Sequence, residues 1–210
     1  MERHAGRVGS SAEVREYYDR IARFYDSWTR QFERVMLGSG RSRTCSRARG
    51  RTLEVAIGTG RNLPYYVPDV ELTGVDLSPA MLDFARQVVR VSGLDAAIVV
   101  GDAQCLSFPD DRFDTVVATL LMSTVGDPLR TVAEMCRVLK PGGRVLLLDM
   151  ARSPVALVRW VEGVVAPLTA RSRFSLVRDA LDYLEPMGFA VEHVGRYRLG
   201  LIEEVVARKM

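Results

Sequence analysis

The stretch that most constrains this chain is an apolar run that ends in a glycine turn, residues 53–62, LEVAIGTGRN. Because glycine has no Cβ, Gly58 and Gly60 let a buried strand turn sharply and bring its backbone against a ligand. Glu54 lies inside the apolar run, and burial of its carboxylate requires a hydrogen-bond donor or a cation. The stretch therefore predicts a strand that ends at a ligand site.

Length and composition indicate one ordinary globular domain of 210 residues, 48% apolar and 26% charged. The most apolar stretch, residues 155–168, contains an arginine and a glutamate and is shorter than the roughly 20 residues of a membrane span. The first residues lack the apolar core of a signal peptide, so we expect a cytoplasmic protein. Three widely spaced cysteines favour free thiols over disulfides or zinc, and no metal is expected.

Two helices are expected before the first strand, after a loose tail of residues 1–10. Ser11 is the expected N-cap, and apolar residues then recur at steps of three and four. A second helix is expected from Trp28 to Leu37, where Gly38-Ser39-Gly40 ends it. Because residues 11–40 precede the first strand, they are free to cap a cleft.

Strands and helices alternate through the middle of the chain. We predict strands at 52–57, 71–76, 97–100, 115–120 and 144–149, and helices at 79–91 and 127–139. Ser78 caps the first of these helices, and Gly93 ends it. The strands are continuously apolar, which is typical of a parallel sheet covered on both faces, so the fold class is doubly wound α/β.

The last part of the chain departs from that alternation. Helices are expected at 155–168 and 175–187, followed by β runs at 189–197 and 201–208. Only Gly200 and its neighbours separate the two runs, too few residues for a crossover helix, so they should pair antiparallel. We therefore expect a single domain over residues 1–210: a mostly parallel, seven-stranded Rossmann-like sheet with a C-terminal antiparallel pair. Residues 152–185 form a helical insertion near the substrate cleft.

Polar residues follow the predicted strands at the edge where open α/β sheets bind ligands. Asp76 ends the second strand and can accept both hydroxyls of a ribose, or alternatively cap the next helix. Asp102 follows the third strand and can accept the exocyclic amine of an adenine, or alternatively lie solvated in a turn. The candidate cofactor-binding residues are Glu54, Ala56, Gly58, Thr59, Gly60, Asp76, Leu77, Met81, Asp102, Ala103, Gln104, Thr119 and Leu120.

The glycine spacing argues against a dinucleotide or a nucleoside triphosphate. A Gly-x-Gly-x-x-Gly fingerprint would need glycine where Leu63 stands, and no Gly-x-x-x-x-Gly-Lys-Ser/Thr loop occurs. A nucleoside ligand without phosphate fits better. The carboxylate of Glu54 would then meet an ammonium or sulfonium end through water or backbone.

Four motifs in order resemble class I S-adenosylmethionine-dependent methyltransferases. They are EVAIGTG at 54–60, TGVDLSPAML at 73–82, the segment from GDAQ at 101 to FD at 114, and RVLKPGG at 137–143. Ala56 stands where the family usually has glycine. The lead-in YDRIARFYD at 18–26 is similar to quinone C-methyltransferases and bacterial phospholipid N-methyltransferases, and residues 52–149 also resemble membrane-associated thiol methyltransferases.

The resemblance implies an enzyme that transfers the methyl group of S-adenosylmethionine by in-line displacement and releases S-adenosylhomocysteine. The apolar residues after the fourth strand favour a small, rather apolar acceptor, methylated on O, S, N or C. Tyr25, Ser123 and Asp149 are candidates to orient it. No general base is evident, since His4 lies in the tail and His193 within a late strand.

Two alternatives stay open. The arginine cluster, Arg41, Arg43, Arg47, Arg49 and Arg51, could bind RNA or anionic lipid. No aromatic residues interleave with it, and nucleic acid and peripheral membrane are the less favoured partners. The chain could also keep the cofactor pocket without methylating, because one fold hosts several chemistries. Its oligomeric state is open.

Overall fold

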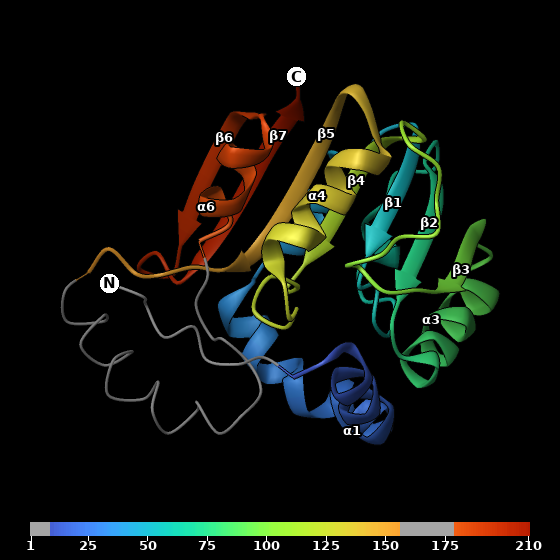
Figure 1. Ribbon diagram of the computed structural model, residues 1–210. Coiled ribbons are helices and arrows are strands. Elements are labelled where there is room, and N and C mark those ends of the chain that lie inside the picture. Colours follow the sequence, from blue (N-terminus) through green and yellow to red (C-terminus); the bar gives the residue numbers. More distant parts are fainter. Residues whose placement is uncertain (1–8, 156–178) are drawn as a thin grey trace.

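The computed structural model describes residues 9–155 and 179–210, and its centre is a seven-stranded sheet (Figure 1). The strands are β1 (Arg51–Val55), β2 (Glu71–Asp76), β3 (Ala96–Val100), β4 (Phe113–Thr119), β5 (Leu139–Met150), β6 (Phe189–Tyr197) and β7 (Ile202–Lys209). The described helices are α1 (Ser11–Met36), α2 (Gly40–Cys45), α3 (Pro79–Ser92), α4 (Pro128–Val138) and α6 (Leu181–Leu184), with 3-10 turns at Leu63–Tyr65 and Glu185–Met187.

The sheet has the order β3-β2-β1-β4-β5-β7-β6. Strands β1 to β5 pair parallel, and β7 pairs antiparallel with both β5 and β6. This confirms the predicted doubly wound, mostly parallel sheet with an antiparallel C-terminal pair. The strand order reverses at β1, which lies between β2 and β4, so the carboxyl ends of these strands form the edge where a ligand is expected.

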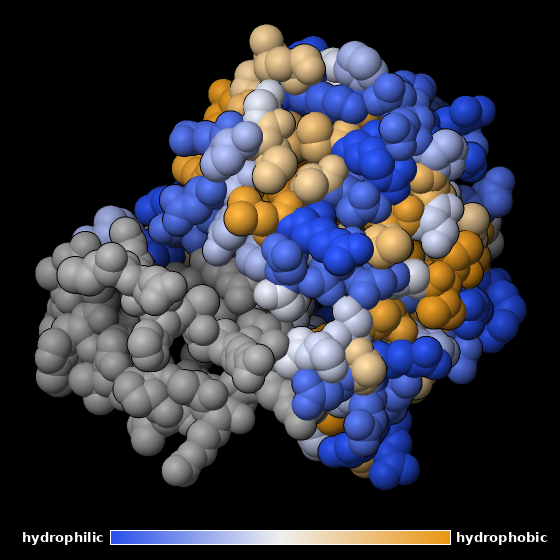
Figure 2. Space-filling view, in the orientation of Figure 1, coloured by the Kyte–Doolittle hydropathy of each residue, from blue (hydrophilic) through white to orange (hydrophobic). Residues whose placement is uncertain are grey.

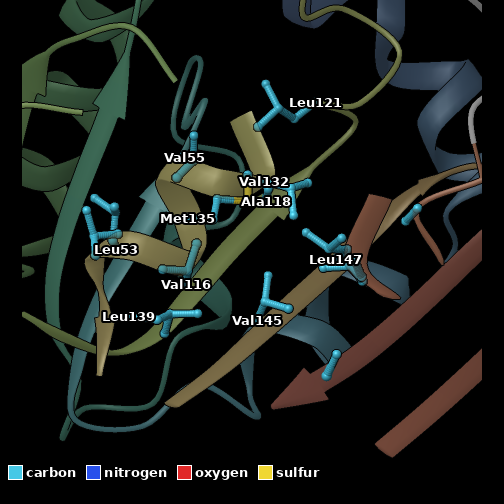
Figure 3. Close-up of a cluster of buried hydrophobic side chains, with 14 of the residues drawn as sticks. Leu53, Val55, Val116, Ala118, Leu121, Val132, Met135, Leu139, Val145 and Leu147 are labelled. Atoms are coloured by element: carbon cyan, nitrogen blue, oxygen red, sulfur yellow. The ribbon is translucent and has the colours of Figure 1, made fainter. Parts of the chain in front are cut away.

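Both faces of the sheet are covered, as the continuously apolar strands predict. On one face α4 and α6 pack over a core from β1, β4 and β5 that includes Val116, Met135 and Leu147 (Figure 3). On the other face α2 and α3 pack over smaller clusters that contain Val117 and Leu82. Alternate residues of each strand therefore point into different layers.

The N-terminal region differs from the prediction. One continuous helix, α1, replaces the two expected helices, since nothing interrupts the helical pattern before Trp28. Its N-cap is Ser10 rather than Ser11, because Ser10 and Glu13 form a reciprocal capping box. In Figure 1 this helix lies beneath the edge where β1 and β2 end.

Two further boundaries differ. Strand β5 begins at Leu139 rather than at 144, and its pairing with β4 is irregular between Phe113 and Thr115. Residues 180–187 form a short helix and a 3-10 turn instead of a longer helix. The expected helix at 155–168, most of the 152–185 insertion, and residues 1–8 of the tail lie outside the described residues.

Helices α3 and α4 carry the predicted capping residues. Ser78 accepts a hydrogen bond from the Met81 N–H at the start of α3, and Gly93 ends that helix with φ 67°. Asp127 caps α4 in the same way, by accepting from the Arg130 N–H. None of the described helices is long and apolar enough to cross a membrane.

The glycine turn after β1 gives a stability prediction. Gly58 and Gly60 have φ values of 58° and 84°, so alanine at either position carries the left-handed penalty of about 1–2 kcal/mol. A Cβ on Gly60 would also lie 2.6 Å from Leu63 and 3.1 Å from the Ala85 backbone, whereas one on Gly58 meets nothing within 4 Å. Gly60→Ala should therefore lower the unfolding free energy by roughly 1–3 kcal/mol more than Gly58→Ala.

Chemical denaturation of both variants beside the parent chain measures this difference. Equal losses would mean that α3 does not pack against the turn as closely as described.

Candidate functional site

A cleft of about 950 Å³, partly open to solvent, lies at the carboxyl ends of β1, β2 and β4 and beneath α1. Every predicted cofactor residue except Gly60 lines it. Gly60 lies behind the turn, where it packs toward Ala85 of α3. The strand ends predicted from the sequence are thus brought together around one cavity.

Asp76 is held by main-chain donors at the end of β2. The N–H of Gly58 donates to Oδ2 at 2.9 Å, and the N–H of Ser78 donates to Oδ1 at 2.9 Å. Burial raises the pKa of Asp76, and main-chain hydrogen bonds from Ser78, Gly58 and Leu77 partly oppose that rise. Asp76 lines the cleft, and a carboxylate has about four acceptor sites, so the group can accept from further hydroxyls.

Glu54 is buried beneath the cleft floor. Asn62 Nδ2 donates to its Oε1 at 2.8 Å, and Tyr66 Oη donates to its Oε2 at 2.9 Å. Burial raises the pKa of Glu54 to about 7, although both hydrogen bonds and the charge of Arg41 lower it. The donors that the sequence required for this carboxylate are therefore Asn62 and Tyr66, and the group changes charge near neutral pH.

The polar contacts continue from Asn62 to the N-terminal helices. Asn62 also donates to Thr119 at the end of β4, and its Oδ1 accepts from Arg41 Nη1 at 2.7 Å. Arg41 pairs with the buried Glu33 of α1 at 2.7 Å. One chain of hydrogen bonds thus joins β1, β4, α2 and α1.

Asp102 lies at the other end of the cleft, where it contacts the first turn of α1. Ser11 Oγ donates to Asp102 Oδ2 at 2.5 Å, and the N–H of Gln104 donates to Oδ1 at 2.8 Å. Gln104 Nε2 donates in turn to Ser11 Oγ at 2.9 Å. The carboxylate that was expected to meet an adenine amine is therefore shared with α1.

Two more contacts fix α1 over the cleft. Asp19 Oδ1 accepts from Ser78 Oγ at 2.5 Å and from the Ala80 N–H at 3.2 Å, at the start of α3. Thr59 Oγ1, in the glycine turn, donates to Asp26 Oδ1 at 2.8 Å. Together with Ser11, these residues tie α1 to the loops after β1, β2 and β3.

The three candidates for orienting an acceptor are divided by the structure. Tyr25 lines the cleft, and burial raises its pKa to about 12, so its hydroxyl is a neutral donor. Ser123 and Asp149 are buried but outside the cleft lining. Asp149 accepts from the N–H groups of Met122 and Met150 at 2.7 and 2.8 Å, which ties the end of β5 to the loop after β4.

Several cleft residues were not predicted. Ser11 and Tyr18 lie fourteen and seven residues before Tyr25, so all three share one face of α1, and this heptad spacing is the signal that could have found them. Among the remaining lining residues are Val14, Arg41, Arg61, Leu121, Thr124 and Val125. No short motif marks these, because they come from separate elements.

Two non-glycine residues of the cleft have left-handed backbone. Ala56, after β1, has φ 57°, and Leu120, after β4, has φ 56°. Such residues cost roughly 1–3 kcal/mol and cluster at functional sites. Ala56 thus occupies a conformation that glycine adopts more easily.

The five arginines of the arginine cluster form ion pairs and hydrogen bonds within the protein. Arg43 and Arg47 both pair with the buried Glu204, at N–O distances of 3.1 and 2.8 Å. The other three contact Glu33, Glu71 and main-chain carbonyls. The alternative of a free basic surface for RNA or anionic lipid at this cluster is therefore not favoured. Within the described ranges, no three His, Cys, Asp or Glu residues are placed to hold a metal.

Comparison with known proteins places this geometry in a family. Residues 53–147 match the model of a methyltransferase domain. A phosphatidylethanolamine N-methyltransferase of Cereibacter sphaeroides is 42% identical over 139 residues, covering 62% of this chain and 68% of the relative. A demethylmenaquinone methyltransferase of Symbiobacterium thermophilum is 33% identical over 165 residues, covering 70% of this chain and 62% of the relative.

Solved structures support the fold. The [4+2]-cyclase SpnF superposes with a TM-score of 0.76 over 96% of this chain and 97% of its own, at 19% identity. A SAM-dependent methyltransferase from Methanosarcina mazei superposes with a TM-score of 0.62 over 76% of this chain and 92% of its own, at 24% identity. The domain match and the 42% identical relative show the family: the chain belongs to the class I S-adenosylmethionine-dependent methyltransferases.

Proposed function

We propose that the cleft binds S-adenosylmethionine with its ribose on Asp76, its adenine between Asp102 and Met81, and its amino-acid end over Glu54. The observation that carries this proposal is the place of Asp76, which lines the cleft while main-chain donors hold its carboxylate at the end of β2. Once bound, the cofactor supplies an electrophilic methyl group on a sulfonium.

The shape of the glycine turn supports this cofactor. A Cβ on Gly58 would meet no protein atom within 4 Å, so the backbone there borders open space that a ligand can fill. No described lining residue is a lysine, and the basic residues Arg41 and Arg61 are both paired with Glu33. The cleft therefore suits an uncharged nucleoside with a cationic end better than a phosphate.

We further infer that the acceptor is small and rather apolar at its reacting end. The cleft lining includes apolar side chains that we call the apolar wall, Val14, Leu121 and Val125, and the rings of Tyr18 and Tyr25. The relatives above are named for methylating phosphatidylethanolamine and demethylmenaquinone, which supports an acceptor that partitions into lipid.

The residues of this chain contribute position and exclusion of water. Holding the acceptor atom in line with the methyl group can supply roughly 7–11 kcal/mol of the barrier. Helix α1 covers the cleft, and the apolar wall keeps water from the sulfonium. Burial keeps the Tyr18 and Tyr25 hydroxyls neutral by raising their pKa, so they can donate hydrogen bonds to an acceptor but hold no base near neutral pH.

Methyl transfer itself is tested with S-adenosylmethionine labelled in the methyl group. Label should pass to a lipid extract, and arms with a demethylated quinol, phosphatidylethanolamine and a hydrophobic thiol identify the acceptor atom. If the cofactor binds but none of these acceptors becomes labelled, the chain instead keeps the cofactor pocket without methylating.

Asp76→Ala should weaken S-adenosylmethionine binding by about 1.5–3 kcal/mol, because a charged hydrogen-bond acceptor is lost. Calorimetry with S-adenosylmethionine and S-adenosylhomocysteine measures the change. Asp83→Ala is the matched control, since that carboxylate is 75% exposed on α3 and should leave the affinity unchanged. Unchanged affinity in Asp76→Ala would contradict the ribose assignment.

Through Glu54, a rise in pH should affect the unfolding free energy and the cofactor affinity in opposite directions. Its pKa of about 7 lies above the ordinary glutamate value of 4.5, so the folded state binds its proton more tightly than the unfolded state. The contribution of this group to the unfolding free energy is therefore lost as pH rises from about 4.5 to 7. Over the same range the carboxylate gains charge, so affinity for the cationic end of the cofactor should rise.

Glu54→Gln, which keeps the acceptor oxygen but cannot ionise, should flatten both pH profiles. Calorimetry measures the affinity and chemical denaturation measures the unfolding free energy, both from about pH 5 to about pH 8, which brackets the raised pKa. A variant whose affinity still rises with pH like the parent would remove Glu54 from the proposed role.

A further inference from the structure

Helix α1 carries a stripe of large apolar side chains that no other described element covers. Phe24, Trp28, Phe32 and Val35 are 40%, 65%, 44% and 52% exposed. At about 100° per residue they fall within roughly 80° of the helix surface. The rings of Phe24 and Trp28 stack with centroids 5.3 Å apart. We call these four residues the aromatic stripe.

Arginines line one side of the aromatic stripe. Arg20, Arg23, Arg30 and Arg34 are exposed and lie on the same flank of α1 by their spacing. Arg20 pairs with Glu16, and the Arg23 guanidinium lies 4.5 Å from the Phe24 ring centre. Arg23, Arg30 and Arg34 form no ion pair with any described residue.

The acidic residues in this half of α1 point elsewhere. Asp26 accepts from Thr59 of the glycine turn, and Glu33 is buried against Arg41 and Arg61. The outward surface from residue 20 to residue 36 is therefore cationic as well as aromatic. In Figure 2 hydrophilic and apolar residues lie interspersed over the region where Figure 1 places α1.

The third side of α1 closes the cleft. Ser11, Tyr18 and Tyr25 face it and border the aromatic stripe, so a surface that covers the stripe would adjoin the cleft mouth. Aromatic rings beside arginines are typical of helices that lie in the bilayer interface, where the rings enter the lipid and the cations meet anionic headgroups. A protein partner would require acidic groups matched to each arginine, whereas an anionic bilayer presents them everywhere.

We propose that the aromatic stripe of α1 and its arginine flank dock on an anionic lipid bilayer. The inference rests on the proposed function in one respect, because a lipid-soluble acceptor would then enter the cleft from the membrane. It assigns membrane contact to α1 and not to the arginine cluster, for which the sequence left anionic lipid as an alternative.

The test uses the full chain with vesicles of phosphatidylglycerol and phosphatidylcholine. The chain has two tryptophans, so a Trp160→Phe background leaves Trp28 as the reporter. Its fluorescence should shift to the blue on vesicles and be quenched by brominated lipid, and sedimentation with the vesicles gives the partition coefficient. Partition should be stronger with phosphatidylglycerol present than with phosphatidylcholine alone.

Two variants separate the apolar and the charged parts of the surface. Trp28→Ser with Phe32→Ser should reduce partition by about tenfold or more, since two apolar side chains no longer leave water. Arg30→Glu should remove most of the preference for phosphatidylglycerol. The controls are Val91→Ser and Arg90→Glu on α3, both exposed, which should partition like the parent.

Three results would overturn the proposal: an unshifted Trp28 on vesicles, equal partition of the stripe variant and the parent, or a dimer in sedimentation equilibrium that the stripe variant dissociates. The last result would assign the stripe to a second copy of the chain. Calorimetry with S-adenosylmethionine is run on every variant. None of the described residues that are substituted lines the cleft, so a parent chain that fails to bind the cofactor would refute the proposed function while leaving the vesicle result readable.

Discussion

The burial of one carboxylate, Glu54, organises the centre of this molecule. A buried ionisable group costs several kcal/mol unless donors surround it. Here Asn62 and Tyr66 supply the donors, and both come from the segment between β1 and β2. To reach the carboxylate, that segment must fold back over the end of β1, and the glycine turn makes the reversal sterically feasible. The geometry of the cleft floor follows from this requirement.

The same requirement extends to the N-terminal helices. Asn62 can hold Glu54 only while its own oxygen is satisfied, and Arg41 of α2 does this. Arg41 is positioned by Glu33 of α1, so polar contacts join the cap to the sheet in addition to the apolar clusters that hold α2 and Leu37. The outward face of the cap stays available for another surface.

The sequence predicted the sheet well because each strand is apolar throughout and is bounded by turn residues. Asp76 and Asp102 could be placed in the cleft because parallel strands bring their carboxyl ends to one edge. The single helix α1 was not predicted: a second helix was expected to begin at Trp28, but α1 is continuous from Ser11 to Met36. Trp28 and its apolar neighbours on the aromatic stripe are exposed, so they do not mark the start of a second core-facing helix.

The site residues contributed by other elements were harder to predict. Arg41 was assigned to a surface cluster, although its partners Glu33 and Asn62 lie 8 and 21 residues away in sequence. Ser123 and Asp149 were placed near an acceptor by their position after strands, but the loop after β4 turns inward and buries them. Which side chain enters a cleft depends on such loop paths, and periodicity carries no information about them.

The contact between Ser11 and Asp102 has a thermodynamic consequence. In the proposed complex, one carboxylate accepts from both the first turn of α1 and the adenine amine. Linkage then requires that the helix start and the nucleoside change each other's affinity by the same factor. Exchange of S-adenosylhomocysteine for S-adenosylmethionine is then coupled to opening of the first turn of α1.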